Sequence, residues 1–565
     1  MLFFIIAWLG LILICFVIGT GILNLFQANC FRKIGDRFIV AAWLGVVILA
    51  ILLLAVSLIL PLSPLVGATA AIMVTILALR SLRTRKEVLT FFSSLPLKVI
   101  WGFFASEICV AAYTARVVTF HDTGLYHFQV IQWLSRFGAV NGLALIHHRF
   151  GFTSSWFALA TPFNAGIFEA RSSALTGGFV IFLALLQFQI SFRRILKHQE
   201  LFPDWFVFFW LLLCLPITLI SHYGAIPISP SPDLPVIFLA GIVSWTFIMI
   251  ANQPVKQEHN STLESRIIPL ILSAGAVTIK LSAIPILFVS VLFYLLGSKL
   301  KFQRILVSGA ITTILLLPIV AFGTITSGCP LFPSSLFCLD LPWSIGGERA
   351  QEVTEIIKNW ARWFGPTPDY GNSWNWFWHW LKLAKGSLTL IICSIVSALL
   401  LIKKSQKSQF NAQKYVIALA LLGMAYMIYG APSLRFGLGY LCLLPALFMA
   451  TYSPLSKSKS KISNVSVITA SFVAITLVFY NFTFHHYNHN IHVLLPPKLK
   501  NPTEFLDKKS HDVSYSIPND IHPKNGNTDN RCWAAELPCT PEHPNNIKLR
   551  NPQKGIRAGF IKVLQ

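Results

Sequence analysis

Hydrophobic runs of roughly twenty residues, separated by short polar segments, recur along most of this chain. A helix needs about 17–25 apolar residues to cross a bilayer, so runs of this length predict membrane-spanning helices. The runs at 266–280 and 283–297 are short and are interrupted at Lys280 and Pro285, which fits either two tilted spans or one bent hairpin. About fourteen spans are predicted in all, at residues 1–26, 38–60, 65–81, 97–116, 172–192, 204–222, 234–252, 266–280, 283–297, 305–326, 383–402, 415–430, 438–452 and 464–482.

The composition agrees with this pattern. Of the 565 residues, 55% are hydrophobic and 12% are charged, whereas about a quarter of a soluble domain is charged. The formal net charge of +23 would suggest nucleic-acid binding in a soluble protein. Here the lysines and arginines fall mostly in short loops between hydrophobic runs, so we expect the lipid bilayer as a partner and no nucleic acid. The sequence predicts an all-α polytopic membrane protein with a transmembrane domain over residues 1–482.

The basic loops predict the orientation of these spans. Loops 27–37, 82–96 and 193–203 each carry three lysines or arginines, whereas loops 61–64 and 223–233 carry none. Short basic loops stay in the cytoplasm. We therefore expect a multi-pass protein of the inner (plasma) membrane with both termini on the extracytoplasmic side.

Three long segments, 117–171, 327–382 and 483–565, fall on the outer side in this prediction. The first two are expected to be large external loops. The third is polar and rich in proline, and we expect it to form an irregular extracytoplasmic C-terminal tail laid over the loops. No phosphate-binding loop of the GxxxxGK[ST] type occurs, so nothing in the sequence indicates nucleotide hydrolysis.

Four cysteines, Cys329, Cys338, Cys532 and Cys539, lie in the outer segments. Cysteines in an oxidising compartment favour disulfide bonds. Four cysteines allow three pairings, and we favour Cys329 with Cys338 and Cys532 with Cys539. A metal site is the alternative, although neither pair has CxxC spacing.

The segment 120–128 is the richest in candidate chemistry, because it places Asp122 among His121, Tyr126 and His127 directly after a predicted span. Asp122 fits a solvated loop residue or a helix cap. Beside cationic groups, it fits instead an ionised base whose neighbours hold a phosphate. A carboxylate among histidines is also a ligand set for a divalent metal ion, and this alternative stays open.

Four further residues fall on the same predicted side. Arg149 shares the loop of Asp122. Asp233 is a helix N-cap or a second carboxylate facing the same cavity. Lys280 either extends to the membrane interface or marks a ligand path. Arg435 either pairs with a carboxylate or binds a phosphate through its planar guanidinium.

A dense group of histidines follows the last predicted span. Such groups near a membrane interface are usually solvated, and metal binding is the alternative. The group consists of His485, His486, His489 and His492.

With an acidic residue opening the first large external loop, the chain resembles the GT-C superfamily of integral membrane glycosyltransferases. The resemblance implies a multi-pass helical fold, a sugar donor linked to polyprenyl phosphate or pyrophosphate, and chemistry on the extracytoplasmic side, with Asp122 in the place of the catalytic acid. The stretches 121–127, 151–157, 231–235 and 329–335 also look like those of a bacterial, largely cyanobacterial, family of multi-pass membrane proteins with no established activity.

The resulting expectation is a glycosyltransferase in which Asp122 deprotonates a hydroxyl of a glycan, lipid or protein acceptor. Cationic side chains would neutralise the departing phosphate, and Asp233 would orient the acceptor or a metal. The alternatives are a transporter or flippase and a non-catalytic component of envelope polysaccharide assembly. The residues expected to bind substrate are His121, Tyr126, His127, Arg149, Asp233, Lys280 and Arg435.

Overall fold

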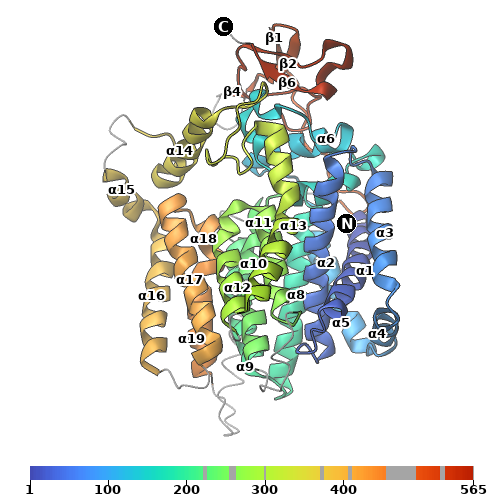
Figure 1. Ribbon diagram of the computed structural model, residues 1–565, viewed down its shortest axis with the longest axis vertical. Coiled ribbons are helices and arrows are strands. Elements are labelled where there is room, and N and C mark those ends of the chain that lie inside the picture. The colour runs from blue at the N-terminus through green and yellow to red at the C-terminus, as the bar shows by residue number, and fades with distance from the viewer. Residues whose placement is uncertain are drawn as a thin grey trace.

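In a computed structural model, the hydrophobic runs fold into a bundle of helices aligned along one axis (Figure 1). The structure describes residues 1–220, 225–252, 263–297, 301–368, 374–404, 410–453, 492–521 and 528–563. Within these ranges, ten helical segments are long and apolar enough to cross a membrane, which makes the chain an α-helical polytopic membrane protein. They are α1 (Leu2–Leu25), α2 (Ile34–Ser57), α5 (Leu97–Thr114), α8 (Leu175–Leu196), α9 (Phe202–Ile220), α10 (Asp233–Ala251), α13 (Phe302–Ser327), α16 (Lys385–Lys404), α17 (Phe410–Gly430) and the consecutive pair α18 (Leu434–Leu441) and α19 (Leu443–Tyr452).

The remaining predicted spans differ from a simple crossing. The run at 65–81 becomes α3 (Pro64–Leu79), and the predicted basic loop 82–96 contains a further helix, α4 (Leu82–Ser93). The two helices are bent by 101° and form at most one broken span. The bend occurs because the Ser81 hydroxyl accepts a hydrogen bond from the Thr84 amide at 3.4 Å and starts a new, polar helix. The short pair at 266–280 and 283–297 becomes α11 (Ile267–Ile279) and α12 (Ile284–Leu296). The run at 464–482 lies outside the described residues, so the described chain has ten spans, or eleven with the broken pair, against about fourteen predicted.

The inner helices of the bundle pack closely. An added Cβ at Gly19 of α1 would lie 1.8 Å from the carbonyl oxygen of Ala41 in α2, so only glycine permits these two backbones to touch. By contrast, α13 exposes Ile314 and Leu317 at 67% and 60% of their surface. Apolar surface of this kind is stable against lipid and costly in water, which fits a protein whose outer helices face a bilayer.

The long polar segments gather at one end of the bundle (Figure 1), which we name the loop end: residues 117–171, 328–368, 374–383 and the described parts of the tail, 492–521 and 528–563. The short helix α4, with Arg83, Arg85 and Lys86, lies at the opposite end, which we name the basic end. The helices of the loop end are η1 (Thr123–His127), α6 (Phe128–Arg136), η2 (Leu143–Leu145), η3 (His148–Gly151), α7 (Ser155–Ala160), η4 (Thr161–Phe163), η5 (Gly166–Phe168), α14 (Gly347–Trp363) and α15 (Asn375–Leu383). The turn η7 (Leu281–Ala283) joins α11 to α12.

The tail is not irregular, as the sequence suggested, but contains short antiparallel strands. Val513, Tyr515 and Ile517 alternate with serines and point inward, a strand pattern that the surrounding prolines and polar residues obscured. The strands form three two-stranded sheets, β1 (Phe505–Ser510) with β2 (Val513–Pro518), β3 (Asp520–Ile521) with β4 (Thr528–Asp529), and β5 (Ile547–Leu549) with β6 (Phe560–Lys562), and η8 (Pro552–Ala558) lies before β6.

The tail covers the loop that follows α5. The Trp533 amide donates a hydrogen bond to the Gly124 carbonyl at 2.9 Å. The Gln129 side chain donates to the carbonyl oxygens of Trp533 and Ala535 at 3.2 and 3.0 Å. An added Cβ at Gly124 would lie 2.4 Å from the Trp533 indole, so the ring rests directly on the glycine. The last segment of the chain therefore fixes the shape of the loop that contains Asp122.

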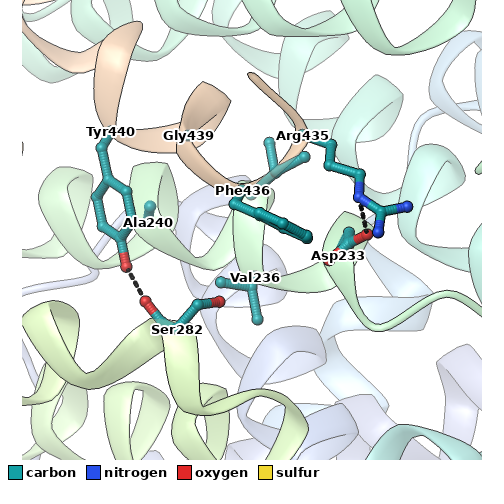
Figure 2. A pocket seen from close by; sticks show the side chains of 9 residues that line it. Asp233, Val236, Ala240, Ser282, Arg435, Phe436, Gly439 and Tyr440 are labelled. Atoms are coloured by element: carbon teal, nitrogen blue, oxygen red, sulfur yellow. Dashed lines mark hydrogen bonds and ion pairs between the residues drawn. The ribbon is translucent and has the colours of Figure 1, made fainter. Parts of the chain in front are cut away.

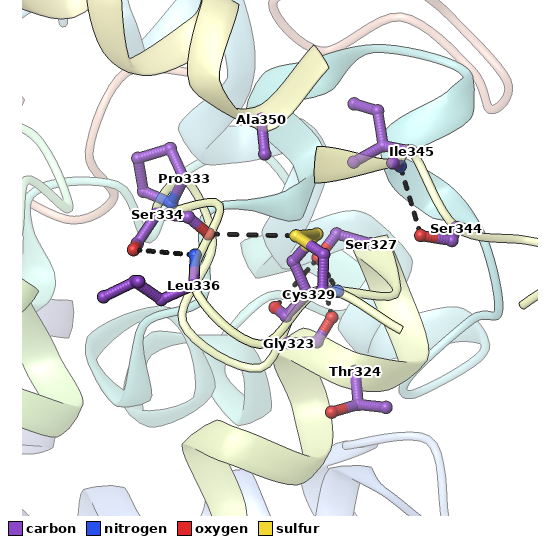
Figure 3. The surroundings of a disulfide bond; sticks show 12 residues. Gly323, Thr324, Ser327, Cys329, Pro333, Ser334, Leu336, Ser344, Ile345 and Ala350 are labelled. Carbon is purple, nitrogen blue, oxygen red and sulfur yellow. Dashed lines mark hydrogen bonds between the residues drawn. A yellow bond between two sulfur atoms is a disulfide. The ribbon is translucent and has the colours of Figure 1, made fainter. Parts of the chain in front are cut away.

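The structure joins Cys329 to Cys338 and Cys532 to Cys539, the pairing that the sequence favours. Cys329 comes directly after α13, and its bond closes a loop that packs beneath Ala350 of α14 (Figure 3). The second bond closes the tail loop that carries Trp533. Both bonds lie at the loop end and hold irregular segments that lack long helices.

Candidate functional site

Asp122 stands at the start of the single π-helical turn η1, which runs directly into α6. A π turn is wider than an α-helical turn, and such turns occur frequently at functional sites. The side chain of Asp122 is 14% exposed. The sequence placed this carboxylate just beyond a span, and the structure places it at the loop end, beneath the tail.

Two arginines from distant segments meet Asp122. Arg435, at the start of α18, places Nη1 3.1 Å from Asp122 Oδ2. Arg149, in η3, places Nη1 3.9 Å from Asp122 Oδ1. The Nδ1 atom of His121 lies 3.6 Å from Oδ1, but this ring is 65% exposed and stands at the rim of the site.

A second carboxylate, Asp233, completes the arrangement. It is the first residue of α10, is 4% exposed, and forms a close ion pair with Lys280, at the break between α11 and η7. The Nε atom of Arg435 lies 3.7 Å from Asp233 Oδ2, so Arg435 bridges the two carboxylates. The Ser231 hydroxyl also donates a hydrogen bond to Oδ2 at 3.3 Å.

We name Asp122, Arg149, Asp233, Lys280 and Arg435 the ion cluster. It contains three cations and two carboxylates, which leaves one positive charge in excess. Its three cationic side chains are 26–28% exposed, whereas the carboxylates are more buried. The cluster therefore presents positive charge toward the space outside it, as a site for an anion would.

The helix ends explain why these side chains meet. Asp233 is favourable in the first turn of α10, where the helix dipole is positive. Arg435 is unfavourable in the first turn of α18 for the same reason, and its two carboxylate partners offset that cost. Lys280 lies where α11 ends, so its side chain turns to Asp233 instead of to lipid.

A small pocket lies beside the cluster between α10 and α18 (Figure 2), and its cavity volume of about 10 Å³ is room for about one water molecule. Asp233 and Arg435 form its charged end, and Val236 and Ala240 form an apolar wall. Phe436 stands between them, and Lys280 Nζ lies 3.9 Å from the centre of its ring. At the far side, Tyr440 from α18 donates a hydrogen bond to the Ser282 carbonyl at 2.9 Å. The pocket therefore joins a charged end to an apolar wall.

The protonation states follow from the surroundings. Burial raises the pKa of Asp122, but the His121 contact and the charges of Arg435 and Arg149 outweigh it and hold the pKa well below its usual range. Burial lowers the pKa of His127 to about 4, so its imidazole is neutral at neutral pH. Burial and the Asp122 charge raise the pKa of Tyr126, which therefore keeps its proton. The site offers an ionised carboxylate, a neutral imidazole and a phenol.

All seven predicted binding residues lie in or next to the cluster, but at different depths. Tyr126 is buried, and its ring lies 5.7 Å from the Arg149 guanidinium carbon. His127 is buried behind it, and its Nδ1 has no hydrogen-bond partner within the described ranges. Of the histidines after the last predicted span, only His492 falls within the described residues.

Two residues of the tail that contact the loop end were not predicted from the sequence. Trp533 covers Gly124, and Glu542 contacts His147 and His148. Within the part of the chain that the structure describes, these two histidines and Glu542 are the one grouping of three side chains spaced to hold a metal ion, and Asp122 is not part of it. No local pattern signals contacts between residues almost four hundred positions apart.

The fold and the cluster together define a polytopic helical membrane protein with a buried, positively charged site at its loop end. Residues 1–442 match the protein family described as "Domain of unknown function (DUF8201)", and the chain belongs to this family. The matched region contains all five residues of the ion cluster and ends at Cys442, directly after α18. Neither a curated protein nor a solved structure matches the chain.

Proposed function

We propose that this protein is an integral membrane glycosyltransferase of GT-C type. It would transfer a sugar from a polyprenyl-phosphate or polyprenyl-pyrophosphate donor to a glycan, lipid or protein acceptor. The loop end would lie on the extracytoplasmic side of the inner membrane, together with both termini. The observation that carries the proposal is the ion cluster, in which an ionised carboxylate and an excess of positive charge stand beside a pocket with an apolar wall.

The phosphate of the donor fits the excess positive charge. Arg435 and Lys280 would bind its oxygens, since charge-assisted hydrogen bonds to phosphate are strong and a guanidinium makes two of them. The first isoprene units of the carrier would lie along Val236 and Ala240 once α18 moves away from α10, because the pocket as it stands holds about one water molecule. Asp233 would keep both cations in place, because it contacts each of them.

Binding of the donor would also activate Asp122. In the resting protein Arg435 stabilises the ionised form of this carboxylate, which makes it a weak base. When Arg435 turns to the phosphate, Asp122 loses a cation and gains an anionic neighbour, and both changes raise its pKa. Asp122 would then take the proton of the acceptor hydroxyl while that oxygen attacks the anomeric carbon. The bond from that carbon to the phosphate oxygen breaks, and the electron pair leaves with the polyprenyl phosphate.

The test uses the purified full-length protein in detergent. The protein is incubated with a set of radiolabelled polyprenyl-phosphate sugars and a membrane extract that supplies acceptors, and the labelled products are separated by chromatography. We expect one donor to be consumed and its label to appear in a new product, and Asp122→Asn to abolish both at unchanged expression. A flippase or a scaffold would leave every donor intact. Intact donors, together with unaltered envelope glycans in a strain with Asp122→Asn, would overturn the proposal.

A further inference from the structure

A second group of ionisable side chains lies at the loop end, outside the ion cluster. His147 Nδ1 lies 3.2 Å from Glu542 Oε2, and His148 Nδ1 lies 3.0 Å from Glu542 Oε1. The two histidines are 2% and 8% exposed, whereas Glu542 is 41% exposed. The ligating atoms of the three side chains all lie within 4.8 Å of one another.

The backbone is shaped to bring these groups together. Adjacent residues of a strand point to opposite faces, but here His147 is extended and His148 opens the 3-10 helix η3, which turns both rings toward Glu542. Thr540 holds the third group in place. Its buried hydroxyl donates to the Ile146 carbonyl at 3.1 Å and accepts from the Glu542 amide at 3.2 Å.

Hydrogen bonding alone does not account for His147. Its two ring nitrogens are fully buried, and neither makes a hydrogen bond of good geometry within the described ranges, even though Nδ1 faces the Glu542 carboxylate. A buried polar atom without a partner costs about 1–3 kcal/mol, so such an atom calls for an explanation. A cation between Nδ1 and the carboxylate would supply the missing partner.

We propose that His147, His148 and Glu542 bind a divalent transition-metal ion of the zinc type. Two imidazoles and one carboxylate favour such ions over calcium and magnesium, which prefer oxygen ligands alone. Around zinc, ligands at about 2.0–2.2 Å stand roughly 3.4 Å apart, close to the observed separations. Three protein ligands leave a fourth position, and the exposed side of Glu542 gives water access to it.

The metal would connect the tail to the ion cluster. Glu542 belongs to the tail, whereas His148 directly precedes Arg149, whose guanidinium lies 3.9 Å from Asp122. Fixing η3 through the ion would hold Arg149 in place and bind the tail over the loop of Asp122. Metal binding itself does not depend on the proposed transferase activity.

The test measures zinc on the intact protein, purified in detergent through an affinity tag without histidines. After treatment with a chelator, zinc is added back and the unbound ion is removed by dialysis, and the retained zinc is counted by mass spectrometry. Glu542→Gln and His148→Asn should each lose one equivalent relative to wild type and weaken zinc binding by about 100-fold or more, since even changes around the ligands cost 10–100-fold.

The matched controls are Glu536→Gln and His543→Asn, which change an exposed carboxylate and an exposed imidazole in the same part of the tail. Both should retain wild-type zinc. Comparing variants with controls excludes zinc held by other histidines, including those at 485–492. Zinc should also slow amide hydrogen exchange in residues 143–151 and 532–545 of the wild type but not of Glu542→Gln. Equal zinc retention in the variants and controls, or no effect of zinc on exchange in the wild type, would overturn the proposal.

Discussion

The two ends of the bundle hold buried charges in different ways. At the basic end, Arg194 Nη1 lies 2.6 Å from both Asp36 Oδ1 and Asp204 Oδ1, and Lys33 lies 3.7 Å from Asp204. Two cations thus match two carboxylates. At the loop end, three cations meet two carboxylates, and the arginines stand farther away, with contacts of 3.1, 3.7 and 3.9 Å.

This difference is the one expected between a group that only braces helices and a group that binds a ligand. Asp204 also accepts a hydrogen bond from the Leu201 amide at 2.8 Å, so it caps the start of α9 while it pairs with Arg194. In a group of this kind the positive and negative charges balance and the contacts are short. Such a group holds helices together without a ligand. In the ion cluster Lys280 pairs closely with Asp233, but the two arginines make longer contacts, and an anion would balance the one excess positive charge.

The strongest test of this difference replaces one carboxylate at each end of the bundle, in two separate variants. Asp122→Asn should lower kcat of the proposed transfer by about 10²–10⁴-fold, the usual contribution of a general base, and should change the melting temperature little. Asp204→Asn should do the reverse, with full activity per folded molecule and a loss of about 1–3 kcal/mol of stability, because a buried partner of Arg194 is weakened. Activity assays and thermal unfolding in detergent measure both effects. Equal effects of the two variants on activity would show that both ends are structural.

Arg194→Ala gives the largest expected loss of stability. It leaves Asp36 and Asp204 buried, with only Lys33 nearby, and removing one partner of a buried pair costs about 3–5 kcal/mol. Arg193→Ala is the matched control, because this neighbouring arginine is exposed. Thermal unfolding should separate the two variants clearly, and similar melting temperatures would show that the basic end contributes little to the fold.

The hydrophobic runs were sufficient to predict the long helices. The residue types in each loop were sufficient to propose candidate site residues one loop at a time. Runs of about twenty apolar residues leave few alternatives to a spanning helix, and ten such segments are present. The break at Lys280 was also visible, since a lysine and a proline interrupt an apolar run. Asp122 and Arg435 could each be proposed as site residues because each stood out in its own loop, but the sequence did not show that the two would meet.

Contacts between distant segments could not be predicted. The bend at Ser81 depends on one cap where the apolar run ends and a polar helix begins, and the position of the tail depends on hydrogen bonds from Gln129 of α6 to Trp533 and Ala535. Glu542 follows a polar, proline-rich stretch that resembles any irregular tail. Its contact with His147 exists because the tail folds back over the loop, and this is a property of the tertiary structure alone.

A smaller effect is expected when the charge of Arg435 is kept but its shape is changed. In Arg435→Lys one ammonium cannot contact both carboxylates and a phosphate as the guanidinium can. Losing one charge-assisted hydrogen bond of about 1.5–3 kcal/mol corresponds to roughly a 10–100-fold fall in kcat/KM, chiefly through a higher KM for the donor. The control is Arg136→Lys, which changes a half-exposed arginine paired with Glu169 at the same end. An unchanged KM would exclude Arg435 from donor binding.

The pH dependence gives the finest comparison of the resting and the donor-bound site. The pKa of Asp122 lies below its usual range, so its stabilising effect is present above about pH 4 and is lost as the pH falls further. Because kcat/KM reports the free enzyme, Asp122 should produce no acid limb in it between about pH 7 and pH 5. In the proposed donor complex, Arg435 would turn to the phosphate, and the pKa of Asp122 would rise. The acid limb of kcat should therefore lie at a higher pH than that of kcat/KM. If the acid limbs of kcat and kcat/KM coincide, Arg435 stays paired with Asp122 during turnover. The ion cluster would then be a structural group, like that of Arg194, Asp36 and Asp204 at the basic end.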